Sequence, residues 1–390
     1  MMIKKLLLVI FSIVLVGSCK QGETNKQEAT QDYSEFENGL SFQHVYDSVI
    51  GGKSFQERLD FHKVPGVSVA IFEKGEIVWR KEYGVLKSDS NRKVNSSTKF
   101  QAASISKAVA ALGVFKLVEQ FNLDIDTDVN EYLKKWKVDY GEFSNEEKVT
   151  IRRLLSHSAG INVAGFYGYS KSSSIPSLLQ LLDGKGNNEK VEVQREPGTE
   201  FLYSGGGYSI LEQLVEDVSG VRFEEYMNKE IFEPLDMSNS TYNLFPRENI
   251  SYAHDTTGNT HPEGWLVYPE LTGAGLWTTP SDMVKFCVAI ENSFYTIDTP
   301  LISDDYAKEM LKPSIEWANG IWWGLGVALK GENENTFYWH SGSNPGGYRC
   351  MMLDFYKKRT GIIIMTNADN GAALYNEIID SFFSYKGIPF

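Results

Sequence analysis

Strand-like runs lie near both ends of this chain of 390 residues, and helical patterns fill the segment between them. Near the N-terminal end, residues 66–72 and 76–84 surround a glycine-containing turn, which is typical of a β-hairpin. Four further strand-like runs and a last helix follow near the C-terminal end, at residues 322–330, 336–340, 348–355, 361–366 and 371–385. The two ends are expected to join in one sheet. The sequence therefore predicts an α+β fold: an antiparallel β-sheet flanked by helices, plus an inserted mostly helical lobe.

The domain organisation follows from the same pattern. The segment from about residue 41 to 390 is long enough for one large domain or two intimately built subdomains. Its α/β part is predicted at about 41–98 and 320–390, and the helical lobe at about 99–319. Helical patterns in the lobe cover residues 101–120, 151–157, 176–183, 208–219, 223–230 and 281–292. A cleft between the two parts is a common place for a functional site.

The first residues have the features of a secretion signal. Two lysines form a charged region, and residues 6–16 form an apolar stretch of the expected length. Small residues then precede Cys19, a pattern that resembles a bacterial lipobox, in which the cysteine is lipidated. We therefore predict a lipoprotein signal peptide at residues 1–18, a lipid anchor at Cys19 and a polar, flexible tether at 19–40. The expected location is a bacterial membrane, with the protein periplasmic or at the cell surface. The alternative is an ordinary signal peptide with a nearby cysteine.

Composition excludes several classes of function. A formal net charge of −13, without a stripe of basic residues and interleaved aromatics, argues against nucleic-acid binding. Beyond Cys19 the chain has only Cys287 and Cys350, too few for a disulfide framework. No other stretch reaches the ~18 apolar residues that a transmembrane helix needs. No metal or cofactor is expected, because His254 and His261 lack helical i, i+4 spacing and no complete nucleotide-binding motif is present.

A serine and a lysine three residues apart open the most apolar helical pattern. On a helix, this spacing places the side chains of Ser104 and Lys107 on one face. Burial favours the neutral form of a lysine, and a serine beside a lysine that can lose its proton is an activated nucleophile. Two further copies of the spacing, within residues 90–99, lie in a polar loop. The alternative interpretation of Ser104 and Lys107 is a small serine packed at a helix start and a lysine that reaches the surface.

Two further segments carry candidate site residues. Tyr203 precedes a glycine run at residues 205–207, where the backbone can approach a ligand closely. His340 ends a predicted strand, where a histidine can exchange protons near neutral pH. Gly342 would give a substrate close access to the strand backbone. Taken alone, Tyr203 also fits a core tyrosine before a turn, and His340 fits a core histidine with one satisfied nitrogen.

Taken together, these motifs resemble those of the serine β-lactamase and penicillin-binding-protein superfamily, in its class C-like branch. The three motifs are Ser104-Ile-Ser-Lys107, Tyr203-Ser-Gly205 and His340-Ser-Gly342. Residues 154–161, 232–237 and 273–282 resemble further blocks of this family, and the resemblance spans about residues 41–385. It implies the β-lactamase/transpeptidase-like fold and a serine hydrolase. The rival α/β-hydrolase fold would need Gly-x-Ser-x-Gly, which this chain lacks.

The resemblance implies roles for the first two motifs. Ser104 would be the nucleophile that forms an acyl-enzyme. Either Lys107 would take the Ser104 proton directly, or it would lower the pKa of Tyr203 so that Tyr203 takes it. Tyr203 would then act as acid toward the leaving group. The sequence leaves the choice of proton acceptor open.

The third motif would supply the substrate-binding side. The oxyanion hole would come from the backbone N–H groups of Ser104 and Ser343, at the start of a helix and next to a strand. Ser341 and Gly342 would line the substrate path beside it. His157 lies outside the three motifs and is interpreted as a structural residue of the helical lobe.

Two departures from the family pattern bear on the substrate. The second motif of amide-cleaving relatives usually ends in Asn, which holds an acylamino group, and here that residue is Gly205. His340 replaces a permanent cation, so a substrate carboxylate would be held less firmly, with Arg349 as the nearest substitute. Both departures shift the expectation from β-lactams and peptidoglycan stem peptides toward simple esters.

The sequence therefore predicts a serine hydrolase that acts on ester or amide substrates by acyl transfer through Ser104, with at most weak activity on β-lactams. The alternatives are a D-alanyl-D-alanine carboxypeptidase-like enzyme and a penicillin-binding lipoprotein that is acylated without turnover. The expected partners are a small-molecule ester, amide or β-lactam, or a cell-wall peptide.

Overall fold

The computed structural model describes residues 32–40, 52–143 and 147–388. The predicted signal peptide at 1–18, Cys19 and most of the predicted tether lie outside these residues. From Tyr33 onward the chain forms one compact unit. Within the described ranges, no helix is both long and apolar enough to cross a bilayer.

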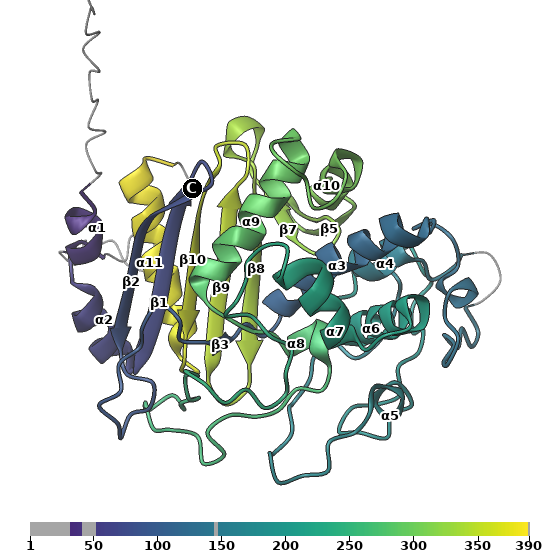
Figure 1. Ribbon diagram of the computed structural model, residues 1–390, viewed down its shortest axis with the longest axis horizontal. Coiled ribbons are helices and arrows are strands. Elements are labelled where there is room, and N and C mark those ends of the chain that lie inside the picture. The colour runs from purple at the N-terminus through teal and green to yellow at the C-terminus, as the bar shows by residue number, and fades with distance from the viewer. Residues whose placement is uncertain (1–31, 41–51, 144–146, 389–390) are drawn as a thin grey trace, which may run out of the picture. The chain divides into compact units, whose positions relative to one another are not determined.

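An eight-stranded sheet forms the centre of this unit (Figure 1). In spatial order, the strands are β2 (Glu76–Gly84), β1 (Gly66–Glu73), β10 (Thr360–Thr366), β9 (Tyr348–Phe355), β8 (Phe337–Asn344), β7 (Ala328–Lys330), β6 (Ile321–Trp323) and β5 (Ile315–Ala318). Every neighbouring pair is antiparallel. The predicted hairpin is formed by β1 and β2, and the two ends of the chain meet where β1 pairs with β10. The predicted α+β fold class is confirmed.

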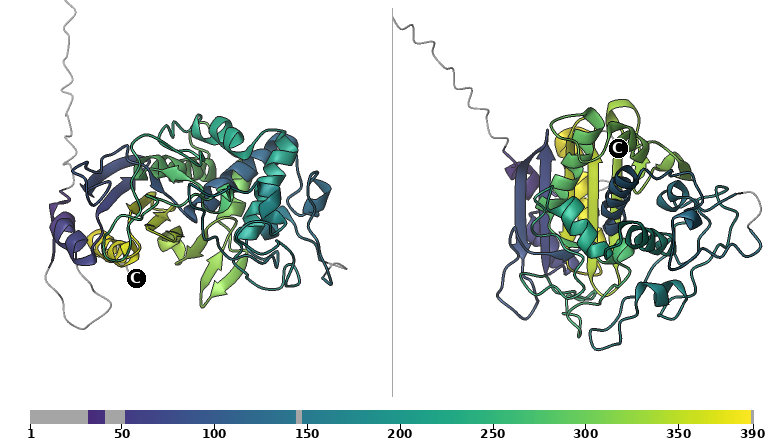
Figure 2. Two further views of the ribbon diagram at one scale, coloured as in Figure 1. Left: turned by 90° about the horizontal axis from the view of Figure 1, so that it is seen from below. Right: turned by 45° about the vertical axis from the view of Figure 1, so that its right-hand side comes forward.

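Strands β1, β9 and β10 are buried on both faces, and alternate residues of these strands enter two separate cores. On β1, Val69 and Ile71 pack in one core, while Ala70 and Phe72 pack in the other. Such alternation is the consequence of the two-residue period of a strand. Helices α2 (Phe55–His62) and α11 (Gly371–Lys386) cover the first face, and α3 (Ile105–Phe121) and α9 (Pro280–Tyr295) lie against the second (Figures 1 and 2).

Further helices form the rest of the helical part. They are α4 (Ile151–Leu155), α5 (Leu178–Leu182), α6 (Gly205–Ser219), α7 (Phe223–Met227), a π-helical turn (Asn228–Phe232), α8 (Leu271–Ala274) and α10 (Asp304–Met310). Of these, α6, α7, α8 and the π-helical turn contact α3. Helix α3 is buried on nearly all sides, as expected for a helix with apolar residues around its whole circumference. It packs against α6, α8 and β8, so its N-terminal end lies where the helical elements meet the sheet.

Residues 33–40 differ from the flexible tether that the sequence predicted over 19–40. They form a short helix, α1 (Ser34–Asn38), that packs on the same core as α2 and α11. The reason is a set of apolar side chains within a polar segment. Tyr33, Phe36 and Leu40 are buried, and the Phe36 ring lies 5.2 Å from that of Trp79 on β2.

The C-terminal strand region also differs from the prediction. The run predicted at 322–330 is two strands, β6 and β7, joined by a tight turn in which the Gly324 N–H donates to the Val327 carbonyl. Gly326 in this turn has a φ of 102°, which favours glycine. Strand β5 and helices α2 and α10 were not predicted. Helix α9, predicted as part of the helical lobe, instead contacts β1 and β10.

Candidate active site

Ser104 lies at the junction between a short strand and the buried helix α3. Strand β3 (Phe100–Gln101) pairs with β4 (Trp277–Thr278), and the Ala102 N–H donates to the Leu276 carbonyl. Ala103 then adopts a φ of 50°, a left-handed conformation that few residues other than glycine accept. This sharp turn starts the helix at once and presents the Ser104 side chain at the helix N-terminus.

Lys107 is held next to Ser104 by the first turn of α3. Its Nζ lies 3.3 Å from Ser104 Oγ and donates to the Gly273 carbonyl over 2.7 Å. The side chain is almost fully buried, and this burial lowers the pKa of Lys107 to about 7. Near neutral pH, much of Lys107 is therefore free amine. The bond to Gly273 fixes the nitrogen, and the neutral form has a lone pair for the Ser104 proton.

Glu270 is a further titratable group that interacts with Lys107 and that the sequence did not reveal. Its side chain is fully buried, and neither carboxyl oxygen has a hydrogen-bond partner among the described residues. Burial raises the pKa of Glu270 to about 8, and the Lys107 charge partly opposes this rise. The attraction is mutual, because Glu270 also raises the pKa of Lys107 against the effect of burial. Glu270 therefore helps to set the charge of Lys107.

Tyr203 faces Ser104 and Lys107 from the segment before α6. Lys107 Nζ lies 5.1 Å from the Tyr203 ring centre. Burial raises the pKa of Tyr203 above its usual value, and a side-chain hydrogen bond with Ser104 partly offsets this. The phenol therefore keeps its proton at neutral pH. Of the two groups, the Lys107 amine has a lone pair that can accept a proton, and the Tyr203 phenol has a proton that it can donate.

His157 holds the backbone on both sides of Tyr203. The Leu202 N–H donates to the His157 carbonyl over 2.7 Å, and the Ser204 N–H donates to His157 Nδ1 over 3.0 Å. The imidazole also lies against the Tyr203 ring, with ring centres 4.2 Å apart. Burial, and then the Lys107 charge, lower the pKa of His157 well below its usual value. A neutral ring with an unprotonated Nδ1 is the form that can accept the Ser204 N–H.

His340 lies on β8 and is nearly fully buried. Its Nδ1 is 2.7 Å from the Ser341 carbonyl, which identifies Nδ1 as the protonated nitrogen. Burial and the Lys107 charge lower the pKa of His340 to about 3. His340 is therefore neutral at physiological pH and offers a free Nε2 lone pair, not a cation.

Gly342 lets β8 approach the turn that carries the nucleophile. A Cβ at this position would collide with the Ala102 carbonyl oxygen and meet Ala103 Cβ at 3.2 Å. Strand β7 pairs with β8 only as far as Trp339, so the β8 backbone beyond it has an edge that β7 does not cover. Ser343 lies on this stretch and lines the same pockets as Ser104. This placement fits the predicted oxyanion hole between the two backbone N–H groups.

Gly205 and Arg349, two residues singled out in the sequence, do not line the pockets that contain Ser104. Gly205, at the start of α6, is buried, and a Cβ there would meet the Phe166 ring at 2.6 Å. Phe166 thus fills the space that a larger side chain at 205 would need. Arg349 does not line a pocket with Ser104. Its guanidinium donates to Asp369 over 2.8 Å and to the carbonyls of Asn344 and Tyr348.

Two pockets of about 300 Å³ each meet at Ser104 and share Ser343. We call one the tryptophan pocket, which is also lined by Tyr203, Trp317, Trp323, Ala328, Trp339, His340 and Ser341. We call the other the phenylalanine pocket, which is also lined by Lys107, Gly165, Phe166, Tyr167, Gly273, Ala274, Asn344 and Pro345. The sequence motifs predicted the residues at the centre of these pockets but not Trp317, Trp323, Trp339 or Phe166, which form their walls.

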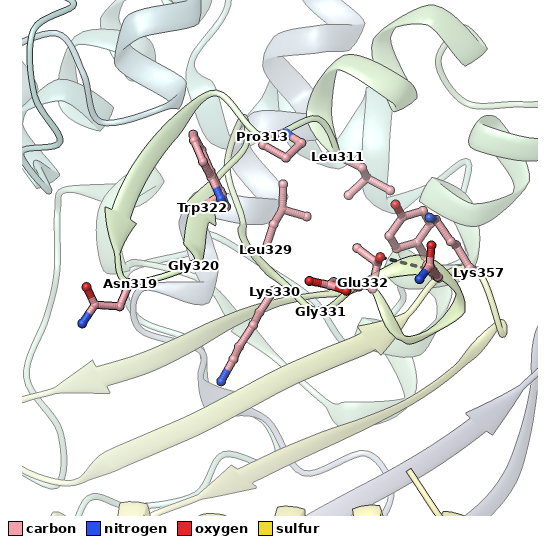
Figure 3. Close-up of a pocket in the computed structure, with 13 residues that line it drawn as sticks. Leu311, Pro313, Asn319, Gly320, Trp322, Leu329, Lys330, Gly331, Glu332 and Lys357 are labelled. Atoms are coloured by element: carbon pink, nitrogen blue, oxygen red, sulfur yellow. Dashed lines mark hydrogen bonds between the residues drawn. The ribbon is translucent and has the colours of Figure 1, made fainter. Parts of the chain in front are cut away.

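A larger cavity of about 800 Å³ lies on another part of the surface (Figure 3). Leu311, Pro313, Trp322 and Leu329 line it together with Lys330, Glu332 and Lys357. None of the reactive groups described above lines this cavity. Among the described residues, no group of three or more histidine, cysteine, aspartate or glutamate side chains is arranged to hold a metal ion. Ser104, Lys107, Tyr203 and His340 therefore converge on the two smaller pockets and not on this cavity.

Known proteins resemble this chain in sequence over most of its length. The family model described as Beta-lactamase matches residues 53–380. The chain is 26% identical to "Protein flp" of Staphylococcus aureus (strain N315) over 328 residues, which covers 82% of this chain and 62% of that protein. It is also 26% identical to "Penicillin-binding protein 4*" of Bacillus subtilis (strain 168) over 321 residues, covering 79% and 69% of the two chains. The chain thus spans about three fifths of the length of the staphylococcal relative.

Solved structures share the fold. The octameric penicillin-binding protein homologue from Pyrococcus abyssi superposes with a TM-score of 0.69 at 25% identity, over 85% of this chain and 76% of that chain. A protein described as "EstCE1, a hydrolase with promiscuous acyltransferase activity" gives a TM-score of 0.70 at 19% identity, over 84% and 95% of the two chains.

Proposed function

This chain belongs to the Beta-lactamase family, and from that premise we propose that it is a serine hydrolase that cleaves carboxylic esters by acyl transfer through Ser104. The family resemblance inferred from the three motifs is confirmed. The proposal depends above all on one observation. Nζ of the buried Lys107 lies 3.3 Å from Ser104 Oγ, and burial brings the pKa of this lysine to about 7.

The proposed reaction gives roles to Ser104, Lys107, Tyr203 and Ser343. Ser104 Oγ attacks the ester carbonyl carbon while its proton passes to the Lys107 amine. The backbone N–H groups of Ser104 and Ser343 stabilise the negative oxygen of the tetrahedral intermediate. When the bond to the leaving oxygen breaks, Tyr203 donates its proton to that oxygen and regains one from the Lys107 ammonium. Water then attacks the acyl-enzyme and gives its proton to the Lys107 amine. Tyr203 donates its proton to Ser104 Oγ as the acid is released, and regains one from the Lys107 ammonium.

The charge of the site supports esters over substrates that carry a carboxylate. Lys107 and His340 are the basic side chains among the described residues that line the two pockets. His340 is neutral, and Arg349 is paired with Asp369. Lys107 is engaged with Ser104 Oγ and the Gly273 carbonyl and is only partly charged, so a substrate carboxylate would lack the permanently charged partner that makes such contacts strong. Phe166 also fills the space next to Gly205, where amide-cleaving relatives place an asparagine.

A labelling experiment followed by a substrate panel tests this function. A fluorophosphonate probe should label the wild type and Tyr203→Phe but not Ser104→Ala. The wild type should hydrolyse p-nitrophenyl acetate with a higher kcat/KM than nitrocefin. Labelling that survives Ser104→Ala would overturn the mechanism, and a higher kcat/KM for nitrocefin would overturn the preference for esters.

A second candidate is a penicillin-binding protein that is acylated without turnover, because two of the similar proteins are named as a penicillin-binding protein or a homologue of one. A time course with a fluorescent penicillin separates the two functions. Stable labelling of the wild type, lost in Ser104→Ala, combined with no ester hydrolysis would favour the binder. Ester turnover without accumulation of the labelled protein would favour the hydrolase.

A further inference from the structure

The two pockets at Ser104 differ in the catalytic group that each one contains. Tyr203 lines the tryptophan pocket and not the phenylalanine pocket, whereas Lys107 lines the phenylalanine pocket and not the tryptophan pocket. A general acid must lie within hydrogen-bond reach of the leaving oxygen. If Tyr203 is that acid, the alcohol part of the ester leaves on its side of Ser104. The acyl part then lies in the phenylalanine pocket.

The walls of the tryptophan pocket are aromatic and uncharged. The Trp323 ring meets the Trp317 ring edge-on at 5.8 Å and 75°, and it meets His340 at 5.4 Å and 87°. The Tyr203 ring lies 5.7 Å from Trp323. Because His340 is neutral, the pocket offers flat apolar surfaces and no charge. Such surfaces favour planar aromatic groups through edge-to-face and offset-stacked contacts.

Among the residues of this wall, Trp317 is expected to contribute little to the stability of the fold. It lies on β5, the last strand of the sheet order, and is 47% exposed. Its ring contacts those of Phe201 and Trp323, each at a centre-to-centre distance of 5.8 Å. Truncation of a half-exposed side chain at a sheet edge leaves the core intact. Trp317 can therefore select substrates without a large contribution to folding.

We propose that the tryptophan pocket binds the alcohol part of the ester, that it prefers a planar aromatic alcohol, and that Trp317 is a residue that determines this specificity. The assignment rests on the proposed ester hydrolysis. In the reaction, the ester C–O bond on the alcohol side breaks, the electron pair stays on the alcohol oxygen, and that oxygen receives the Tyr203 proton. The product that leaves through the tryptophan pocket is thus an aryl or arylmethyl alcohol. The acid part stays bound to Ser104 until water releases it.

Two matched acetates isolate the alcohol side. Benzyl acetate and cyclohexylmethyl acetate share the acyl group and have leaving alcohols of similar size, but only the first has a planar ring. The wild type should show a higher kcat/KM for benzyl acetate. In Trp317→Ala this ratio should fall by about tenfold, the upper size expected for one lost aromatic contact. Trp317→Phe should restore most of it.

Trp322 gives a matched control. It is 39% exposed on the adjacent strand β6 but lines the separate 800 Å³ cavity shown in Figure 3. Trp322→Ala should therefore leave the benzyl to cyclohexylmethyl ratio unchanged. Circular dichroism and a melting temperature for each variant report whether the fold is kept.

The acyl side is tested with ethyl acetate and ethyl phenylacetate. Trp317→Ala should leave the ratio of these two substrates unchanged. If Trp317→Ala alters the acyl ratio and not the alcohol ratio, the pocket assignment is reversed and the proposal is wrong. If p-nitrophenyl acetate is not hydrolysed by the wild type at all, the proposed function itself fails, and the assignment fails with it. Normal p-nitrophenyl acetate turnover with no preference for the benzyl ester overturns the assignment alone.

Discussion

The Ser204 N–H donates to His157 Nδ1 over 3.0 Å, immediately beyond Tyr203 in the chain. Together with the bond from the Leu202 N–H to the His157 carbonyl, it fixes the backbone on both sides of the proposed proton donor. The sequence suggested no more than a structural residue of the helical lobe at this position. The structure shows that what His157 holds in place is Tyr203.

We expect His157→Leu to lower kcat by about 100-fold with little change in KM, because a displaced proton donor slows the chemical step. His157→Asn should recover part of the loss, since asparagine keeps an acceptor and tolerates the φ of 57° found here. Steady-state kinetics on p-nitrophenyl acetate measure both effects. An unchanged kcat in a folded His157→Leu protein would contradict the positioning of Tyr203 by this residue.

The pH dependence of activity should follow the charge of Lys107. Burial lowers the pKa of Lys107 to about 7, and only the neutral amine can accept the Ser104 proton. The value of kcat/KM should therefore rise as pH increases through about 7.

Glu270→Gln tests the cause of this profile. Glu270 raises the pKa of Lys107, so its neutral replacement should move the ascending limb to lower pH. Glu189→Gln, which replaces an exposed glutamate outside the three motifs, serves as control and should not move it. A shift of the Glu270→Gln limb to higher pH would show that the carboxyl does not act through the lysine charge.

Substitution of Gly342 should lower the catalytic activity, because it moves β8 away from Ser104. A Cβ in Gly342→Ala would collide with the Ala102 carbonyl and push β8 away from the turn before Ser104. Because Ser343 moves with this strand, we expect kcat/KM to fall by about 100-fold or more through loss of oxyanion contacts. Rates of fluorophosphonate labelling should fall in parallel. Full labelling at the wild-type rate would show that the close approach of the strand is not needed for reactivity.

Short-range motifs were predictable from the sequence, because each places its residues by local geometry. Ser104 and Lys107 lie within one helical turn, and strands β1 and β2 share one tight turn. The walls of the pockets were not predictable, because they depend on long-range packing. Trp317 reaches the site through β5, whose hairpin with β6 turns at Asn319-Gly320, a recognised hairpin signal, but nothing in the sequence places this hairpin beside Ser104. Arg349 was misjudged since its partner Asp369, twenty residues later, is brought close only by the fold.

The ionisation states of the site residues also could not be predicted from the sequence, because they depend on burial. The spacing of Ser104 and Lys107 indicated a nucleophile, but the proton acceptor depends on how deeply Lys107 and Tyr203 are buried. Glu270 lies in none of the three motifs, and its influence on Lys107 arises from burial at the start of α8.

At the N-terminal end, the polar composition of residues 19–40 concealed three apolar side chains. A segment of low mean hydropathy can still pack when Tyr33, Phe36 and Leu40 find a common core.

We propose that Cys19 is lipidated and anchors the protein to a bacterial membrane. The full-length wild type, expressed in bacteria, should incorporate radiolabelled palmitate and fractionate with membranes. Cys19→Ala should lose the label and appear in the soluble fraction. Cys287→Ala, within α9, should keep the label. A Cys19→Ala protein that stays in the membrane fraction would contradict the anchor.

Asp354 should make the protein less stable as pH rises. The side chain is fully buried on β9, and burial, with Glu291 next to it, raises the pKa of Asp354 well above its usual value. The folded state therefore keeps a proton that the unfolded state loses above pH ~4. Because the folded state then binds more protons, the free energy of unfolding decreases as pH rises toward the folded-state pKa.

Asp354→Asn removes this ionisation while keeping nearly the same shape. We expect its Tm to exceed that of the wild type at pH 8 by about 2 °C or more, the shift that corresponds to ~1 kcal/mol in a chain of this size. The difference should shrink at pH 4.5, where less of the unfolded-state carboxyl is ionised. Asp298→Asn, at an exposed position, should change Tm at neither pH. Equal gains for Asp354→Asn at both pH values would mean that packing, not protonation, accounts for the effect.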